Sequence, residues 1–370
     1  MPPLELPRRL LLGPGPSNVH PRVLQAMSQP LVGHLDPAFL EVLDEVQQGL
    51  RSLFGTRNPL TLPISATGSA GMEACLANLL ERGDRIVVGV AGVFGERMAE
   101  VARRIGAEVT RVETAWGTAL PAEAMAEAIE RVRPKVVSFV HAETSTGVHQ
   151  PVPAIARAAR DAEALVVLDC VTSLAGVPVE LDAWGIDAAY SGTQKCLSCP
   201  PGLSPVSFSP RAVELVRNRA TPVQSWFLDL TLLAGYFGEE RVYHHTAPVS
   251  AVVGLAEALR MVLDEGMETR IARHQGASEA LIEGTAPLGF EPLVAREIRL
   301  PMLNAMKLPP ALEASGEAAL RRKLLERYGI EIGGGLGALA GKIWRIGLMG
   351  ENARVINVEA LLFALRKELA

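Results

Sequence analysis

A lysine that follows an aspartate at the end of an apolar run could carry out covalent chemistry. Lys195 lies in the segment 190–202, which reads Y-S-G-T-Q-K-C-L-S-C-P-P-G. Asp169 ends the run L-V-V-L-D, and Thr144 closes the run V-S-F-V-H-A-E-T. A lysine amine can condense with an aldehyde cofactor, and a buried carboxylate can keep the ring nitrogen of that cofactor protonated. The order of these residues therefore predicts an aldehyde-cofactor site, with a plain surface lysine as the alternative for Lys195.

A second candidate is a cluster of small and hydroxyl-bearing residues, Thr67, Gly68 and Ser69. The apolar period resumes at Met72, which predicts a helix from about Ser69 to Gly83. The free N–H groups and the dipole of a helix N-terminus favour an anion such as phosphate. An ordinary helix cap is the alternative, since the cluster matches neither the P-loop nor the G-x-G-x-x-G pattern.

Strands and helices alternate between residues 84 and 193, which predicts an open, mainly parallel sheet covered on both faces. We expect strands at 86–91, 107–112, 135–141, 164–169 and 186–191, and helices at 95–105, 121–133 and 151–162. Ligands of such sheets bind beyond the carboxyl ends of the strands. Phe94, Thr144, Asp169 and Lys195 all fall at or just after such ends, and Phe94 could stack on an aromatic ring. The fold class is therefore α/β.

The chain divides into an arm and two domains. Residues 1–18 are Pro-rich and predict an extended arm, for which a partner subunit is one candidate contact. Residues 19–265 form the large domain and 266–370 a small α+β domain, with the boundary at Gly266 between two long helices. The expected elements of the small domain are strands at 298–308, 330–332 and 342–348 and helices at 316–328 and 354–369.

Arg345 alternates with apolar residues on one of these expected strands. An arginine in apolar surroundings needs an anionic partner. A substrate carboxylate held by the guanidinium fork is one answer, and a structural Asp or Glu is the other.

Composition limits the class of protein. With 370 residues, 48% hydrophobic and 21% charged, the chain is globular and large enough for a sizeable core. The net charge of −5 comes without a block of Lys or Arg, so we expect no nucleic acid and no membrane partner. We find no bilayer-length apolar run and no signal pattern, and we expect a cytoplasmic protein.

The cysteines and an adjacent histidine pair are candidates for metal or redox chemistry. The chain has four cysteines, Cys75, Cys170, Cys196 and Cys199. They are too few for a disulfide framework, and C-x-x-C at 196–199 is either a redox or half-zinc motif or two small residues in a turn. His244 and His245 should point to opposite faces of an extended segment, so we expect no metal there.

Several segments together resemble one known family. These are G-P-G-P-S-N, G-S-A-G-M-E-A, G-V-F-G-E-R, H-A-E-T-S-T-G-V, D-C-V-T-S-L, Y-S-G-T-Q-K-C, V-Y-H-H-T-A-P-V and W-R-I-G-L-M-G. They resemble class V pyridoxal-phosphate-dependent aminotransferases of the alanine–glyoxylate type over nearly the whole chain. The resemblance implies the PLP-dependent transferase fold of the aspartate-aminotransferase type, with a large sheet of the seven-stranded type and a small C-terminal α+β domain.

The resemblance also implies a role for each site residue. Lys195 condenses with pyridoxal 5'-phosphate, Asp169 pairs with its ring nitrogen, and Phe94 stacks on the ring where the family often has Trp. Thr144, or Ser145 instead, reaches the ring hydroxyl. The phosphate is held by Thr67, Gly68, Ser69 and Gln194, with Ser69 where some members have His, and by Tyr243 and Thr246 of a neighbouring subunit. Substrate is bound by Arg345, Gly15 and His34.

The implied activity is transfer of an amino group from alanine or serine to glyoxylate, which gives glycine and a 2-oxo acid. The implied assembly is a homodimer with active sites at the interface, contacted by the N-terminal arm. Ureidoglycine–glyoxylate or another class V amino transfer is the alternative. A cysteine desulfurase and a non-catalytic nucleotide-binding α/β module are more distant ones.

Overall fold

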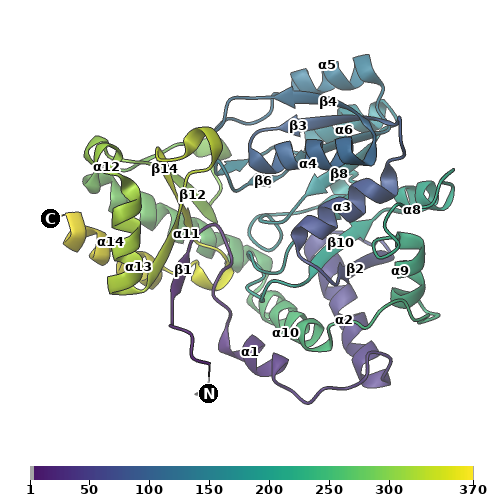
Figure 1. Cartoon of the computed structure of the whole chain (residues 1–370), viewed down its shortest axis with the longest axis horizontal. Helices are drawn as coiled ribbons and strands as arrows, with labels where there is room; N and C mark the ends of the chain where they lie inside the picture. Colours follow the sequence, from purple (N-terminus) through teal and green to yellow (C-terminus); the bar gives the residue numbers. More distant parts are fainter. Residues whose placement is uncertain (1–3, 370) are drawn as a thin grey trace.

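The computed structural model describes residues 4–369, apart from the side chains of 313–315, and contains two main sheets with separate hydrophobic cores (Figure 1). The large sheet has the order β2-β10-β9-β8-β5-β3-β4. Its strands are β2 (Leu60–Ile64), β3 (Arg85–Val90), β4 (Glu108–Glu113), β5 (Val136–Val140), β8 (Leu165–Asp169), β9 (Ala188–Tyr190) and β10 (Ser204–Phe208). Strands β4, β3, β5, β8 and β9 run parallel, and β10 is antiparallel to both β2 and β9.

Helices cover both faces of this sheet. On one face α3 (Gly68–Leu79) contacts α4 (Val93–Ile105), and on the other α5 (Ala122–Val132) contacts α6 (Pro153–Asp161), as right-handed crossovers require (Figure 1). Beyond them α2 (Pro37–Phe54) packs against α10 (Val249–Glu265). As the sequence predicts, α2 begins at Pro37, with the Asp36 carboxylate accepting the Ala38 N–H, and ends at Gly55 in the left-handed conformation.

Shorter elements complete this part of the chain. They are α1 (Pro21–Met27), β6 (Ala142–Glu143), β7 (Val148–His149), α7 (Leu181–Trp184), α8 (Pro210–Arg217) and α9 (Leu230–Phe237). No helix within residues 4–369 is long and apolar enough to cross a bilayer.

The second sheet has the order β1-β13-β14-β12-β11. Its strands are β1 (Leu10–Leu12), β11 (Glu291–Pro292), β12 (Leu303–Lys307), β13 (Ile330–Gly334) and β14 (Ile343–Gly347), and its helices are α11 (Met267–Thr285), α12 (Pro310–Ser315), α13 (Glu317–Tyr328) and α14 (Val355–Leu369). Strand β1 pairs in parallel with β13, so the N-terminal arm enters the C-terminal sheet of its own chain (Figure 1). Residues 1–3 of the arm lie outside the described residues, and the division of the chain at residue 265 stays a prediction.

Most predicted elements are confirmed within a few residues, and two differ for local reasons. Helix α3 ends at Leu79 rather than Gly83, because Leu80 adopts an extended conformation with its side chain buried in the core. The Asp84 carboxylate then accepts the Glu81 N–H at 2.7 Å. Strand β12 begins at Leu303 rather than at 298, because residues 296–298 form a 3₁₀ turn and Pro301 has no N–H to donate.

Candidate active site

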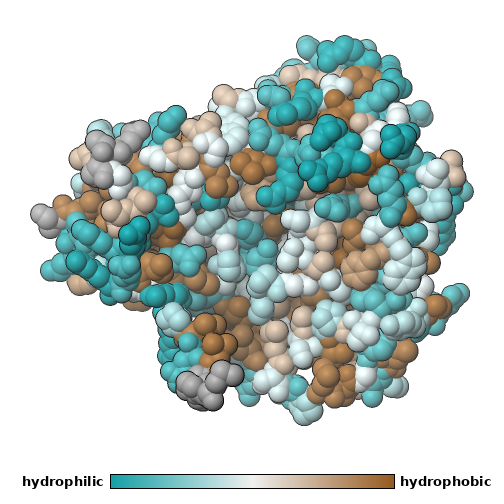
Figure 2. Space-filling view, viewed as in Figure 1, coloured by the Kyte–Doolittle hydropathy of each residue, from teal (hydrophilic) through white to brown (hydrophobic). Residues whose placement is uncertain are grey.

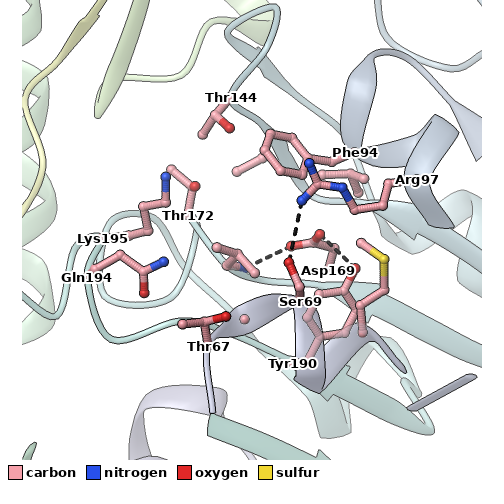
Figure 3. A pocket seen from close by; sticks show the side chains of 15 residues that line it. Thr67, Ser69, Phe94, Arg97, Thr144, Asp169, Thr172, Tyr190, Gln194 and Lys195 are labelled. Carbon is pink, nitrogen blue, oxygen red and sulfur yellow. Dashed lines mark hydrogen bonds between the residues drawn. The ribbon is translucent and has the colours of Figure 1, made fainter. Parts of the chain in front are cut away.

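A cavity of about 170 Å³ lies at the carboxyl edge of the large sheet, where β5, β8 and β9 end (Figure 3). Eight residues predicted from the sequence line it together: Thr67, Gly68, Ser69, Phe94, Thr144, Asp169, Gln194 and Lys195. They come from five separate loops, helix starts or strand ends. The parallel topology therefore brings residues up to 128 positions apart, from Thr67 to Lys195, to one place.

Lys195 enters the cavity from the loop after β9. Its ammonium donates a hydrogen bond to the carbonyl oxygen of Pro14. Burial lowers the pKa of this amine to about 8, helped by the positive charge of Arg345 and opposed by Cys196 and Asp169. The loop is held in place by Ser17, whose N–H bonds the Gln194 carbonyl at 2.9 Å and whose hydroxyl bonds the Lys195 carbonyl at 2.8 Å.

Gly15 makes the room that the lysine amine occupies. A Cβ atom at this position would lie 2.6 Å from Lys195 Nζ, and φ of Gly15 is +103°. Both the space and the backbone conformation therefore require glycine here. The predicted substrate-binding residue Gly15 thus lies against the Lys195 amine, on the side of the N-terminal arm.

Asp169, the last residue of β8, presents its carboxylate to the same cavity. Its Oδ1 accepts the Val171 N–H at 2.8 Å, and its Oδ2 accepts the Tyr190 hydroxyl at 2.7 Å. Burial raises its pKa to about 7, and the nearby Glu143 carboxylate adds to the rise. A buried carboxyl poised in this way gains from a cation placed beside it, such as a protonated ring nitrogen.

The N-terminus of α3 opens into the cavity without a side-chain cap among the described residues. Thr67 is its N-cap residue, and no side chain among the described residues caps the helix. Gly68 brings the backbone close, since its Cβ would stand 3.2 Å from Val171 Cγ2. Beside it the amide oxygen of Gln194 is buried without a hydrogen-bond partner in residues 4–369. Open N–H groups and an unpaired amide fit a phosphate group bound at this end of the cavity.

Arg97 is a charged cavity residue that was missed from the sequence. The guanidinium carbon of Arg97 lies 5.0 Å from the centre of the Phe94 ring, and its Nη1 lies 3.4 Å from Ser69 Oγ (Figure 3). Arg97 therefore places a positive charge between the Phe94 ring and Ser69 at the start of α3. Its signal was the segment G-V-F-G-E-R, where the arginine follows the aromatic residue by three positions and so shares its helix face.

Glu143 was also missed, and it holds the backbone that carries the Phe94 ring. Its carboxylate accepts the N–H groups of Phe94 and Gly95 at 3.2 and 3.4 Å and the Ser145 hydroxyl at 2.5 Å. Ser145 Oγ in turn accepts the Val93 N–H at 3.0 Å. The segment that carries Thr144 thus caps α4, and Ser145 is occupied in that cap.

Arg345 on β14 reaches the site from the second sheet. Its Nε donates to the Gly334 carbonyl at 2.8 Å, and its Nη1 lies 3.4 Å from the Thr144 carbonyl oxygen. No carboxylate lies within 4 Å of its guanidinium among the side chains that the structure describes. The partners of this buried cation are carbonyl groups, which leaves part of its fork for an incoming carboxylate.

Three predicted residues lie outside the cavity, in a separate surface group. The rings of His34 and Tyr243 are 5.4 Å apart, Tyr243 is 60% exposed, and Thr246 is exposed. The Nε2 atom of His34 is buried and unpaired among the described residues. The expectation that His244 and His245 point to opposite faces is wrong, because their segment is irregular and their Nδ1 atoms lie 2.8 Å apart.

Metal chemistry receives no support from residue clusters. Across residues 4–369 there is no group of three or more His, Cys, Asp or Glu side chains placed to hold an ion. All four cysteines are buried free thiols. The Cys196 thiol bonds the Thr172 carbonyl at 3.3 Å, and burial raises its pKa to about 11, so it is no ready nucleophile.

Comparison with known proteins decides the family. The family model for aminotransferase class V matches residues 9–337. The chain belongs to the class V aminotransferase family. Alanine–glyoxylate aminotransferase of Drosophila melanogaster is 41% identical over 99% of this chain and 94% of its own length. The solved alanine–glyoxylate aminotransferase from Nostoc sp. is 49% identical, with a TM-score of 0.97 over 100% of this chain and 97% of that one. The solved ureidoglycine–glyoxylate aminotransferase from Bacillus subtilis is 40% identical, with a TM-score of 0.96 over 99% and 94%.

These likenesses confirm the fold and the enzyme class predicted for this class V aminotransferase. The seven-stranded sheet with its smaller C-terminal unit is the architecture that the resemblance implied.

Proposed function

We propose that this class V aminotransferase uses pyridoxal 5'-phosphate to move an amino group from alanine or serine to glyoxylate. The observation that carries the proposal is the meeting of Lys195, Asp169 and the open N-terminus of α3 in one cavity. Relatives named alanine–glyoxylate aminotransferase, at 41% and 49% identity over nearly the full chain, support the choice of substrates.

The residues present fit the cofactor. Thr67, Gly68, Ser69 and Gln194 would hold its phosphate, Phe94 its ring face, Thr144 its ring hydroxyl and Asp169 its ring nitrogen. When bound, pyridoxal phosphate supplies an aldehyde that accepts the amino group and a ring that takes up negative charge. Arg97 adds the positive charge that a phosphate dianion favours.

Lys195 is the proton carrier of the site. An amine with a pKa of about 8 is neutral in a useful fraction of molecules near neutral pH, so it can attack an aldehyde and accept a proton from the substrate α-carbon. The Pro14 carbonyl oxygen orients this amine. The Asp169 carboxylate would keep a positive charge on the ring nitrogen of the cofactor. That positive charge would stabilise the negative charge that develops as the α-proton leaves the substrate.

Arg345 binds the carboxylate that both the amino donor and glyoxylate carry. Its guanidinium lies beside the Thr144 carbonyl at the edge of the cavity, so substrate held there has its α-carbon directed toward Lys195.

We propose a homodimer as the working assembly, with its sites at the interface. The surface group of His34, Tyr243 and Thr246 lies among exposed apolar side chains, which are Leu31, Val32, Leu35, Trp226 and Val242. Figure 2 shows apolar patches on the visible face, among them one along its lower edge. Tyr243 and Thr246 would reach the phosphate, and His34 the substrate, of the partner subunit. The buried free thiols support a reducing, cytoplasmic location.

The test begins with the cofactor and then addresses the substrates. Purified protein should be yellow, and borohydride should fix the cofactor on the peptide that contains Lys195. Alanine, serine and ureidoglycine, each with glyoxylate, should then be compared by kcat/KM. A preference for ureidoglycine would select the alternative that the Bacillus subtilis relatives suggest. A colourless protein that binds no pyridoxal phosphate would refute the proposal.

A further inference from the structure

The hydroxyl of Tyr190 is placed directly behind the Asp169 carboxylate. The two residues end neighbouring parallel strands, β9 and β8, and are paired in register. The Tyr190 side chain is fully buried, and its hydroxyl lies 2.7 Å from Asp169 Oδ2. This bond is the one hydrogen bond that the phenol makes with the described residues.

The phenol is an obligatory donor. Burial raises the pKa of Tyr190 well above its usual range, and the adjacent Asp169 carboxylate adds to the rise. The hydroxyl therefore keeps its proton near neutral pH. A protonated hydroxyl with no other partner among the described residues bonds to Asp169.

Helix α3 also packs closely on the Cβ atom of Tyr190. Helix α3 packs against β9 and β10 at Gly71, where a Cβ atom would lie 2.9 Å from Tyr190 Cβ and 2.2 Å from Ser204 Oγ. The missing side chain at residue 71 lets the helix close over the tyrosine. Close packing at Gly71 holds the start of the Tyr190 side chain, and the bond to Asp169 holds its hydroxyl.

The Asp169 carboxylate is thus held from both sides. Val171 N–H fixes Oδ1 and Tyr190 fixes Oδ2, and each oxygen keeps a second lone pair for another donor. Around it stand the Glu143 carboxylate, which disfavours its charge, and the Lys195 amine, which favours it. The Cys75 and Cys170 thiols are buried nearby, and burial keeps both of them protonated.

We propose that Tyr190 is a positioning residue that keeps Asp169 ionised and aligned for a protonated ring nitrogen. The inference rests on the proposed function, because it requires a pyridine cofactor in the cavity. In this role Tyr190 acts through Asp169, to which its hydroxyl is bonded. The lining of the cavity by Asp169 and Tyr190 together supports the assignment.

The test measures cofactor affinity as a function of pH. The full chain should carry Lys195→Ala in every sample, so that the lysine neither reacts nor titrates. The dissociation constant of pyridoxal phosphate is then measured from pH 6 to 9 by fluorescence. Affinity should rise with pH as Asp169 ionises, and Tyr190→Phe should move this rise upward by about one pH unit. At pH 7 the same change should weaken binding about fivefold, because a shift of the Asp169 pKa from about 7 to about 8 lowers its ionised fraction from about a half to about a tenth.

Two controls separate this role from a loss of packing. Tyr328→Phe removes a chemically matched bond, from a tyrosine hydroxyl to the Glu368 carboxylate at 3.1 Å, and should leave the pH profile unchanged. In an Asp169→Asn background, Tyr190→Phe should change affinity less than about threefold, because the group through which it acts is gone. Circular dichroism should show that all variants are folded.

An unchanged pH profile in folded Tyr190→Phe would overturn the inference, and so would an equal loss of affinity in the Asp169→Asn background. A parent chain that binds no pyridoxal phosphate at any pH would instead refute the proposed function.

Discussion

The pKa of the Lys195 amine can be tested without cofactor or substrate. Burial lowers it to about 8. An amine with that pKa is about 9% neutral at pH 7 and about 91% neutral at pH 9, whereas an ordinary lysine at about 10.4 goes from about 0.04% to about 4%. The reactivity of Lys195 should therefore rise about tenfold over these two pH units, and that of an ordinary lysine about a hundredfold.

The assay is trace labelling with an amine-reactive reagent. Cofactor-free protein is labelled at a series of pH values together with a free lysine derivative, and the peptide that contains Lys195 is quantified by mass spectrometry. Limited access of the reagent to the cavity lowers the labelling rate of Lys195 by the same factor at every pH, so the shape of the pH curve is unchanged. We expect a plateau near pH 9 for Lys195.

A labelling rate that climbs without a plateau past pH 10 would refute the reasoning. It would mean that the opposing charges of Asp169 and Cys196 outweigh the burial of Lys195. The variant Asp169→Asn separates the effect of the Asp169 charge from that of burial. Removal of the carboxylate should lower the Lys195 pKa and so move the plateau to lower pH.

Three further predictions concern the same site. Arg345→Leu should raise KM for the amino donor and for glyoxylate by about 10- to 100-fold, because a charged hydrogen bond to each substrate carboxylate is lost. Both KM values are measured by steady-state kinetics, and two unchanged values would contradict the prediction. Lys195→Met should stabilise the cofactor-free chain by ~1–3 kcal/mol at pH 7, because a buried lysine cation whose pKa is lowered in the folded state opposes folding. This gain in the free energy of unfolding should shrink as pH rises from about 8 toward 10. Denaturant unfolding that shows no gain at pH 7 would refute the prediction. Gly15→Ala should cost ~1–3 kcal/mol of stability and most of the activity, because the new methyl group meets Lys195 Nζ at 2.6 Å on a backbone with φ of +103°; an active, equally stable variant would show that the loop moves freely.

The sequence predicted the large sheet and most of the cavity because both follow from local patterns. Alternating apolar runs mark the strands, and parallel topology places their carboxyl ends together. Thr67, Phe94, Asp169 and Lys195 could therefore be assigned to one site before any contact was known. Tyr243 and Thr246 stay predictions, because their expected partner is another subunit.

The features that sequence reasoning missed depend on contacts between distant segments. Glu143 looks like any acidic residue after a strand, yet it caps a helix that begins 50 residues earlier, at Val93. Tyr190 was part of the first motif considered, but its role depends on the register of β9 against β8. Strand β1 is only three residues long and next to prolines, so it has no detectable period.

The pairing of β1 with β13 has a consequence for how the enzyme is made. Leu10–Leu12 leave the ribosome early, but Ile330–Ile332, their partners, emerge more than 300 residues later. The carbonyl that accepts a hydrogen bond from the Lys195 amine belongs to Pro14, two positions after β1. A nascent chain therefore cannot assemble its reactive centre until synthesis is almost finished, and the first residues made are among the last to reach their native contacts.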